Sequence, residues 1–171
     1  TDKGSIHADI VVVATNGYTG GSEHRFSRFL RQRTVPVRSS IIVTENLGRE
    51  RVKALMPALR MYGNTAKLTT YFRPTPDGQR ILLGARGAEH NPTLKTVHFL
   101  RNRLISILPQ LADVQIDYCW TGYVAFNRQL IPRIFSHNGV HYSAAYAGSG
   151  TVWARWCGKK LAEQVLGQTN A

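Results

Sequence analysis

The stretch Ile10-Val11-Val12-Val13-Ala14-Thr15-Asn16-Gly17-Tyr18 joins a run of apolar, mostly β-branched residues to a turn. A continuous apolar run of this kind predicts a strand that is buried on both faces, as in a parallel sheet. The Asn-Gly pair predicts a turn directly after the strand. Because few residues precede this strand, we expect its neighbours to come from a sheet that begins upstream.

The same patterns predict the other elements of the fold. We expect strands at 35–44, 67–72, 80–83, 114–126 and 140–146, and helices at 91–108 and 149–166. Asp77-Gly78 lies between the second and third of these strands and predicts a hairpin there. The first helix is expected to be capped by Asn91 and to bury a stripe that includes Leu94, Val97 and Leu104. The predicted class is α/β (α+β), with a mixed, largely antiparallel sheet and helices in the middle of the chain.

Composition narrows the possible functions. The chain has 171 residues, of which 43% are hydrophobic, so it is expected to build a core, and no run of about 18 apolar residues predicts a membrane span. Cys119 and Cys157 lack metal-ligand spacing, so no metal site is expected, and two unpaired thiols favour a reducing, cytoplasmic location.

The formal net charge is +12, and eight Lys or Arg residues lie between Arg25 and Lys53. Such a segment indicates either a patch for nucleic acid or an anionic substrate, or a solvated basic face. No helix-turn-helix, RNA-binding or zinc-finger pattern accompanies the charge, which favours the solvated face.

The segment Tyr146-Ala147-Gly148-Ser149-Gly150-Thr151 lies between a predicted strand and the last predicted helix. Glycines let the main chain approach a ligand closely, and a helix N-terminus offers free N–H groups and a positive dipole end. The segment therefore indicates a site for a negatively charged oxygen, although an ordinary strand-to-helix turn has the same pattern.

Five segments of the chain, taken together, resemble the D-amino-acid-oxidase-like (DAO) family of FAD-dependent oxidoreductases. They occur in the order and spacing of that family and cover most of the chain. The chain resembles in particular the gamma-glutamylputrescine-oxidase-like branch. The segments are residues 8–18, residues 71–87 with Phe72-Arg73-Pro74-Thr75-Pro76-Asp77-Gly78, Trp120-Thr121-Gly122-Tyr123, residues 146–150, and the helix that ends Lys160-Leu161-Ala162-Glu163-Gln164-Val165-Leu166-Gly167.

The resemblance implies FAD as cofactor and oxidation of the C–N bond of an amine or amino acid by hydride transfer to the flavin. It implies three regions: 1–20 as a remnant of the FAD domain, 21–113 as the substrate domain, and 114–171 as the return to the FAD domain. It places Thr15, Asn16 and Gly17 near the phosphates of FAD. It places Gly148, Ser149, Gly150, Thr151 and Val152 at the pyrimidine edge of the flavin.

Two residues are candidates for substrate binding. Arg73 is expected either to orient the substrate or to serve as a structural arginine of the hairpin, and Tyr146 either to wall the active site or to pack in the core. No side chain is assigned as a catalytic acid or base, because in this chemistry the cofactor takes the electrons and the protein positions and desolvates the substrate.

The sequence departs from the family at three places. The GxGxxG fingerprint for the ADP half of FAD is absent. Ala145 and Ser149 stand where members usually have Gly and often His. Amino-acid-specific members have an Arg shortly after the segment that matches Trp120-Thr121-Gly122, to bind the substrate carboxylate. In this chain no cation follows that segment until Arg128, so an amine is the expected substrate. The chain is thus expected to be the C-terminal part of such an enzyme. It is expected to lack the FAD-binding half and to be inactive alone. The alternatives are a truncated fragment that cannot hold FAD and has no enzymatic role and, less favoured, a basic nucleic-acid-binding module.

Overall fold

The computed structural model describes residues 4–19, 28–65, 69–86 and 93–167, and it divides into two compact units. The first unit contains 1–37 and 123–171, and the second contains 38–122. Each unit is described by itself. The functional domains expected from the sequence are not the same as these units, and their assignment stays a prediction. The unit boundaries at 37/38 and 122/123 each fall inside a strand of the structure.

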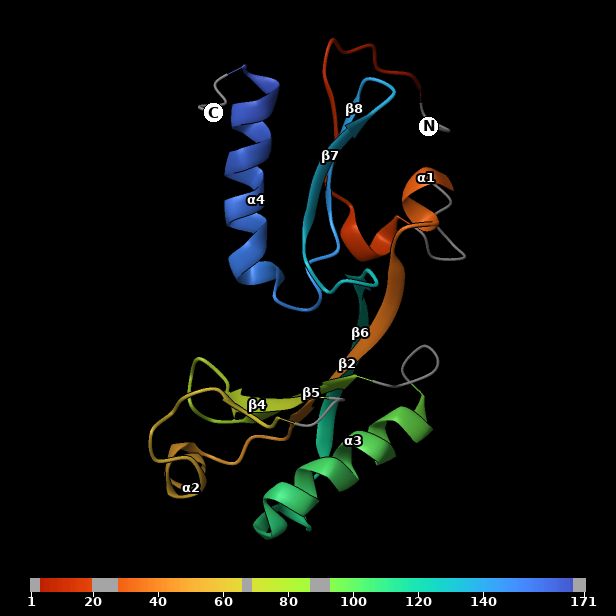
Figure 1. The fold of residues 1–171 in the computed structure, drawn as a ribbon. Coiled ribbons are helices and arrows are strands. Elements are labelled where there is room, and N and C mark those ends of the chain that lie inside the picture. Colours follow the sequence, from red (N-terminus) through yellow and green to blue (C-terminus); the bar gives the residue numbers. More distant parts are fainter. Residues whose placement is uncertain (1–3, 20–27, 66–68, 87–92, 168–171) are drawn as a thin grey trace. The chain divides into compact units, whose positions relative to one another are not determined.

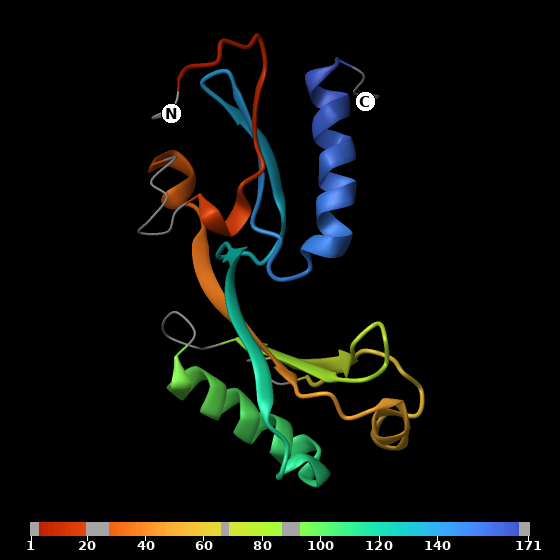
Figure 2. The same ribbon diagram turned by 180° about the vertical axis from the view of Figure 1, so that it is seen from behind.

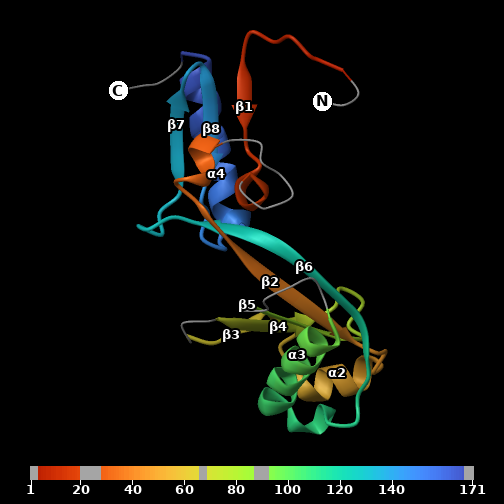
Figure 3. The ribbon, with the colours of Figure 1, turned by 90° about the vertical axis from the view of Figure 1, so that its right-hand side faces the viewer.

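The first unit is built on a three-stranded sheet with the order β1-β8-β7 (Figures 1 and 3). β1 (Val11–Val13) pairs in parallel with β8 (Val140–Ala144), and β7 (Arg133–His137) pairs with β8 in antiparallel. The helix α4 (Gly150–Val165) lies alongside β7 and β8 (Figure 3). A 3₁₀ turn, η1 (Asn16–Tyr18), follows β1, and the short helix α1 (Arg28–Arg31) precedes β2.

Alternation of side chains along β7 and β8 gives this sheet two different faces. Phe135 and Tyr142 are cross-strand partners with stacked rings, and the ring of Phe29, which belongs to α1, lies against both. On the α4 side, Ser143 is hydrogen-bonded to the thiol of Cys157. The sheet is therefore covered by α1 on one face and by α4 on the other.

The expectation that the first strand is buried on both faces is wrong for the described residues. Val11 is 43% exposed and Val12 is 50% exposed, and only Val13 is buried. The physical reason is that β1 forms an edge of the three-stranded sheet and pairs only with β8 among the residues that the structure describes.

The second unit holds a five-stranded sheet with the order β3-β4-β5-β2-β6. Its strands are labelled in Figure 3 and seen from another side in Figure 2. These strands are β3 (Tyr62–Gly63), β4 (Thr70–Pro74), β5 (Ile81–Arg86), β2 (Val35–Thr44) and β6 (Ile116–Phe126). The pairs β3–β4, β4–β5 and β5–β2 are antiparallel, which confirms the mixed, largely antiparallel fold and the predicted hairpin. β2 and β6 extend in sequence past the unit boundaries.

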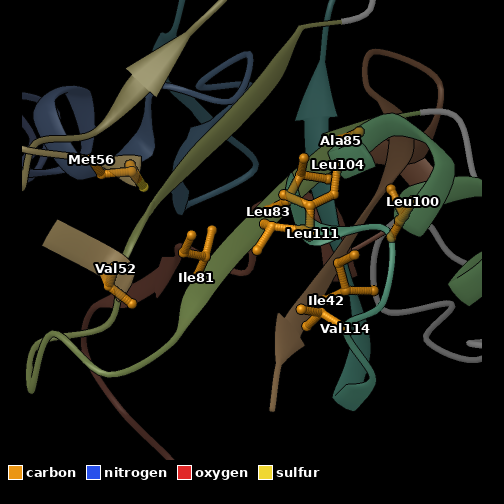
Figure 4. Packing of buried hydrophobic residues seen from close by; sticks show 10 residues of the cluster. All are labelled: Ile42, Val52, Met56, Ile81, Leu83, Ala85, Leu100, Leu104, Leu111 and Val114. Carbon is orange, nitrogen blue, oxygen red and sulfur yellow. The ribbon is translucent and has the colours of Figure 1, made fainter. Parts of the chain in front are cut away.

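Two helices of the second unit, α2 (Arg49–Leu55) and α3 (Leu94–Ile107), contribute to one apolar core (Figure 4). Val52 comes from α2, Leu100 and Leu104 come from α3, and Ile42 and Leu83 come from the sheet. All five are at most 2% exposed. The 3₁₀ turn η2 (Pro109–Leu111) ends the segment after α3 and adds Leu111 to this core.

The buried face of α3 agrees with the expected one at Leu104 and differs from it elsewhere. Its buried residues are Thr96, Leu100 and Leu104, whereas Leu94 is 89% exposed. The helix begins only at Leu94, and the N-cap is Thr93, whose side chain accepts a hydrogen bond from the Thr96 amide. The predicted cap Asn91 lies outside the described residues. Among the described helices, none combines the length and the apolar character that crossing a bilayer requires.

Candidate functional site

Two loops that the sequence singled out lie at the same end of the first unit. β1 and β8 are parallel neighbours, so the segments that follow them, 14–19 and 145–149, leave the sheet at one edge. The side-chain Oδ1 of Asn16 accepts a hydrogen bond of 3.0 Å from the Ala145 amide. This bond links the first predicted group of cofactor-binding residues to the loop that carries the second.

The first loop places Gly17 where no side chain fits. A Cβ added there would lie 2.7 Å from the carbonyl oxygen and 2.9 Å from the Cβ of Tyr123. Asn16 has φ +45°, a left-handed conformation that Asn adopts more readily than most residues. The hydroxyls of Thr15 and Thr19 are hydrogen-bonded to each other, and Thr19 Oγ1 also donates to the Asn16 carbonyl. The loop is thereby fixed against β6 at Tyr123.

The second loop contains three residues with left-handed backbone, two of which are not glycine. Ala145 has φ +65°, Ala147 has φ +52° and Gly148 has φ +87°. Such a conformation costs an alanine about 1–2 kcal/mol, and strain of this kind is concentrated at functional sites. The Ala147 amide donates to the Ala125 carbonyl at 3.0 Å, which holds the loop in place. No sequence pattern indicates this strain, because alanine usually adopts helical or extended backbone.

Tyr146 lies in the interior of the first unit. It is 8% exposed, and its hydroxyl is 2.8 Å from the hydroxyl of Ser143. Its ring lies beneath Gly150, where an added Cβ would be 3.6 Å from the ring edge. The ring therefore supports the turn that begins α4, and its predicted contact with a substrate stays a prediction.

The N-terminus of α4 offers hydrogen-bond donors that the helix itself cannot use. Ser149 is the N-cap residue, but its side chain makes no capping hydrogen bond, and the first turn has no acidic residue. Gly148, Ser149, Thr151 and Val152 are exposed. With the dipole of a 16-residue helix behind them, the first amides suit an acceptor oxygen or a negative charge.

The remaining predicted site residue, Arg73, belongs to β4 of the second unit. Its guanidinium Nη1 donates to the Pro74 carbonyl at 3.3 Å, and the residue is half-buried. The structure thus brings Thr15, Asn16 and Gly17 together with the loop before α4, while Arg73 lies in the other unit.

Both cysteines are free thiols, and burial raises the pKa of each. Cys157 lies on the buried face of α4, where its hydrogen bond with Ser143 opposes that rise in pKa. No group of three or more His, Cys, Asp or Glu side chains that could hold a metal occurs in the described part of the chain.

Comparison with known proteins gives one family and a consistent fold. A family model described as FAD dependent oxidoreductase (DAO) matches residues 1–164. The probable oxidoreductase OrdL of Rhizobium meliloti (strain 1021) is 33% identical over 178 residues, which cover 99% of this chain and 38% of that protein. The gamma-glutamylputrescine oxidoreductase of Escherichia coli (strain K12) is 28% identical over 173 residues, which cover 98% of this chain and 39% of that protein.

Among solved structures, the deglycating enzyme fructosamine oxidase (Amadoriase II) from Aspergillus fumigatus superimposes with a TM-score of 0.76 at 15% identity. The match covers 99% of this chain and 42% of that one, and at this identity it supports the fold alone. The chain spans less than two fifths of the length of the two curated relatives.

Proposed function

The chain belongs to the DAO family of FAD-dependent oxidoreductases, and from this premise we propose that the intact protein oxidises the C–N bond of an amine with FAD as its cofactor. In this proposal the chain is the C-terminal part of the enzyme. The observation that carries the proposal is the joined pair of loops at the N-terminus of α4, held by the Asn16–Ala145 hydrogen bond.

The residues at this end of the first unit fit a flavin. The pyrimidine edge of a flavin carries oxygen acceptors, and the uncapped start of α4 presents amide donors with no acidic side chain in the first turn. Gly148 to Val152 would hold that edge, and Thr15, Asn16 and Gly17 would lie near the phosphates. When bound, FAD supplies the acceptor for a hydride from the carbon of the C–N bond.

The contribution of this chain is to keep its donors in place before the cofactor binds. Asn16 fixes the Ala145 amide, Ala125 fixes the Ala147 amide, and Tyr146 packs beneath Gly150. Donors that are already oriented cost no reorganisation when charge develops opposite them. The strained backbone at Ala145 and Ala147 agrees with a loop whose shape is set by its binding role rather than by local preference.

We also propose that a further segment of the polypeptide, which carries the phosphate-binding half, covers apolar surface of the first unit. Val11 and Val12 on β1 and Trp153 and Trp156 on α4 are each at least 40% exposed. The length of the relatives leaves room for such a segment. The isolated chain is therefore expected not to retain FAD, and purified chain with a yellow spectrum and about one flavin per chain would contradict this.

The proposed substrate is an amine or a gamma-glutamyl amine rather than a free α-amino acid. A carboxylate buried beside a flavin needs a paired cation, and Arg gives the bidentate geometry. Residues 123–126 carry only apolar and aromatic side chains. The basic stretch from Arg25 to Lys53 would still favour a substrate with a distant acidic tail, such as a gamma-glutamyl group.

The test is a comparison of kcat/KM for gamma-glutamylputrescine, glycine, sarcosine and D-alanine with the intact protein. We expect gamma-glutamylputrescine to be preferred. A clear preference for a free amino acid would mean that another residue supplies the cation. Arg73 is then the first candidate, and an Arg73→Gln protein with a raised KM for that amino acid would identify it.

A further inference from the structure

The first unit contains a cavity of about 510 Å³ that adjoins the loop before α4 at Ala145 but is lined by none of the residues proposed to bind FAD or the substrate. It lies between α1, the segment 127–129 and the start of β7. Its volume is within the range of about 300–1,000 Å³ that is typical of small-molecule sites. Its apolar part comes from Leu30, Phe135 and Ala144, of which Leu30 and Ala144 are at most 1% exposed.

Three arginines line this cavity, and no Asp or Glu does so among the described residues. Arg33 is held in place, because its guanidinium lies 3.6 Å above the ring of Phe29 and donates to the Phe29 carbonyl at 3.0 Å. Arg133 donates to the side-chain oxygen of Gln129. Within the described ranges, Arg128 has neither a hydrogen bond nor an ion pair.

The charge of these arginines is not neutralised by the described part of the protein. The ion pairs found there join Arg51 to Asp113, Arg80 to Asp117, and Lys159 and Lys160 to Glu163. Arg33 and Arg133 instead contact neutral oxygens, which leaves their positive charge available to a ligand. Three guanidinium groups around one cavity attract an anion and match the oxygen geometry of phosphate or carboxylate.

We propose that this cavity is a binding site for a small phosphomonoester, with the phosphate among Arg33, Arg128 and Arg133 and the organic part against Leu30 and Phe135. A phosphate carries up to two charges and offers three oxygens, so it satisfies three arginines better than the two oxygens of one carboxylate. The buried apolar floor formed by Leu30 and Ala144 distinguishes the cavity from a flat basic face for nucleic acid, since it offers a place for an organic group.

The test is isothermal titration of the chain with phenyl phosphate, inorganic phosphate, benzoate and a short DNA duplex at constant ionic strength. We expect phenyl phosphate to bind more tightly than inorganic phosphate or benzoate. Arg128→Gln and Arg133→Gln should each weaken phenyl phosphate about tenfold, since each removes a hydrogen bond to a charged group. The matched control Arg155→Gln, on the exposed side of α4, should change nothing.

Three results would overturn the proposal. These are no binding of phenyl phosphate by the wild-type chain, equal binding by all three variants, and benzoate binding as tight as phenyl phosphate. DNA binding that is lost with the same two arginines would identify a nucleic-acid surface in place of a small-molecule site. Because Arg128 is exposed and makes no hydrogen bond or ion pair in the described part, the Arg128→Gln chain should keep the wild-type unfolding temperature, so its result does not depend on Arg133→Gln remaining folded.

Discussion

Gly17 shows most clearly how a single residue positions the site. Its missing side chain allows the turn after β1 to touch the main chain of Tyr123, and this contact involves backbone atoms that cannot rotate away. The Asn-Gly pair predicted a turn at this place, but only the structure shows the close approach. The same turn presents Asn16 to the Ala145 amide, so packing at Gly17 and the joining of the two loops depend on each other.

We predict that Gly17→Ala lowers the free energy of unfolding by about 1–3 kcal/mol, because the added Cβ overlaps the Tyr123 carbonyl. Urea denaturation followed by circular dichroism measures the change. The matched control is Gly158→Ala in α4, where an added Cβ meets nothing and the better helix former should leave stability equal or higher. A Gly17→Ala chain as stable as the wild type would refute the contact.

Some features of single residues can be predicted from the sequence, and others cannot. The glycine-rich loop before α4 and the turn after β1 carry local signals in glycine and asparagine, and both were predicted. The left-handed backbone of Ala145 and Ala147 carries none, because it is imposed by hydrogen bonds to Asn16 and Ala125, which are distant in sequence. The grouping of the cavity arginines was also missed, since Arg33, Arg128 and Arg133 are brought together by tertiary structure alone.

At the scale of the elements, the two glycines at the start of α4 allow a structural role to be distinguished from a role in cofactor binding. No atom of this chain prevents a side chain at Gly150, since an added Cβ would make an ordinary van der Waals contact of 3.6 Å with the Tyr146 ring. Gly148 differs, because its φ of +87° strains any other residue. Gly150 is therefore the position at which a substitution reports on a neighbouring ligand rather than on folding.

We predict that Gly150→Val in the intact protein lowers flavin content and turnover while changing the free energy of unfolding of the apoprotein by less than about 1 kcal/mol. The bulky side chain would stand where the flavin edge is proposed to lie. Absorbance of the purified protein gives the flavin content, and Gly158→Val on an exposed part of α4 is the control. Normal flavin content and turnover in Gly150→Val would count decisively against a cofactor-facing loop.

Elements were predicted best where their signals were local. β2, the β4–β5 hairpin, β6, β8 and α4 were all expected close to their observed positions. β7 was missed, although Asn138-Gly139, with φ +50° and +74°, forms the kind of two-residue turn that joins β7 to β8. On α3, Leu104 was expected to be buried but Leu100 was missed, because apolar residues lie on both sides of the helix and only packing on the sheet selects Leu100.

At the scale of the whole molecule, three carboxylates make stability depend on pH. The pKa of Asp77 is lowered by its hydrogen bond from Thr75, that of Asp113 by its hydrogen bond from Arg51, and that of Glu163 by its hydrogen bond from Lys160. A carboxyl whose pKa is lower in the folded than in the unfolded chain stabilises the fold above its unfolded pKa. That contribution is lost as the pH falls through the folded pKa.

We therefore predict that the free energy of unfolding falls as the pH is lowered below about 4, the range of unperturbed carboxyl groups. Urea denaturation across this range measures the fall. Asp113→Asn should make it shallower, because one of the three groups no longer takes up a proton, whereas Asp9→Asn, at an exposed position in the segment before β1, serves as the control. Stability that is unchanged or higher in acid would contradict this linkage.

One measurement on the intact protein tests the proposed cofactor and the proposed chemistry together. It is the flavin absorbance after anaerobic addition of gamma-glutamylputrescine. The account predicts a purified protein with the visible spectrum of a flavin, which bleaches rapidly with this amine and far more slowly with glycine at the same concentration. A protein that binds no flavin, or whose flavin spectrum is unchanged by any amine or amino acid, would contradict the account.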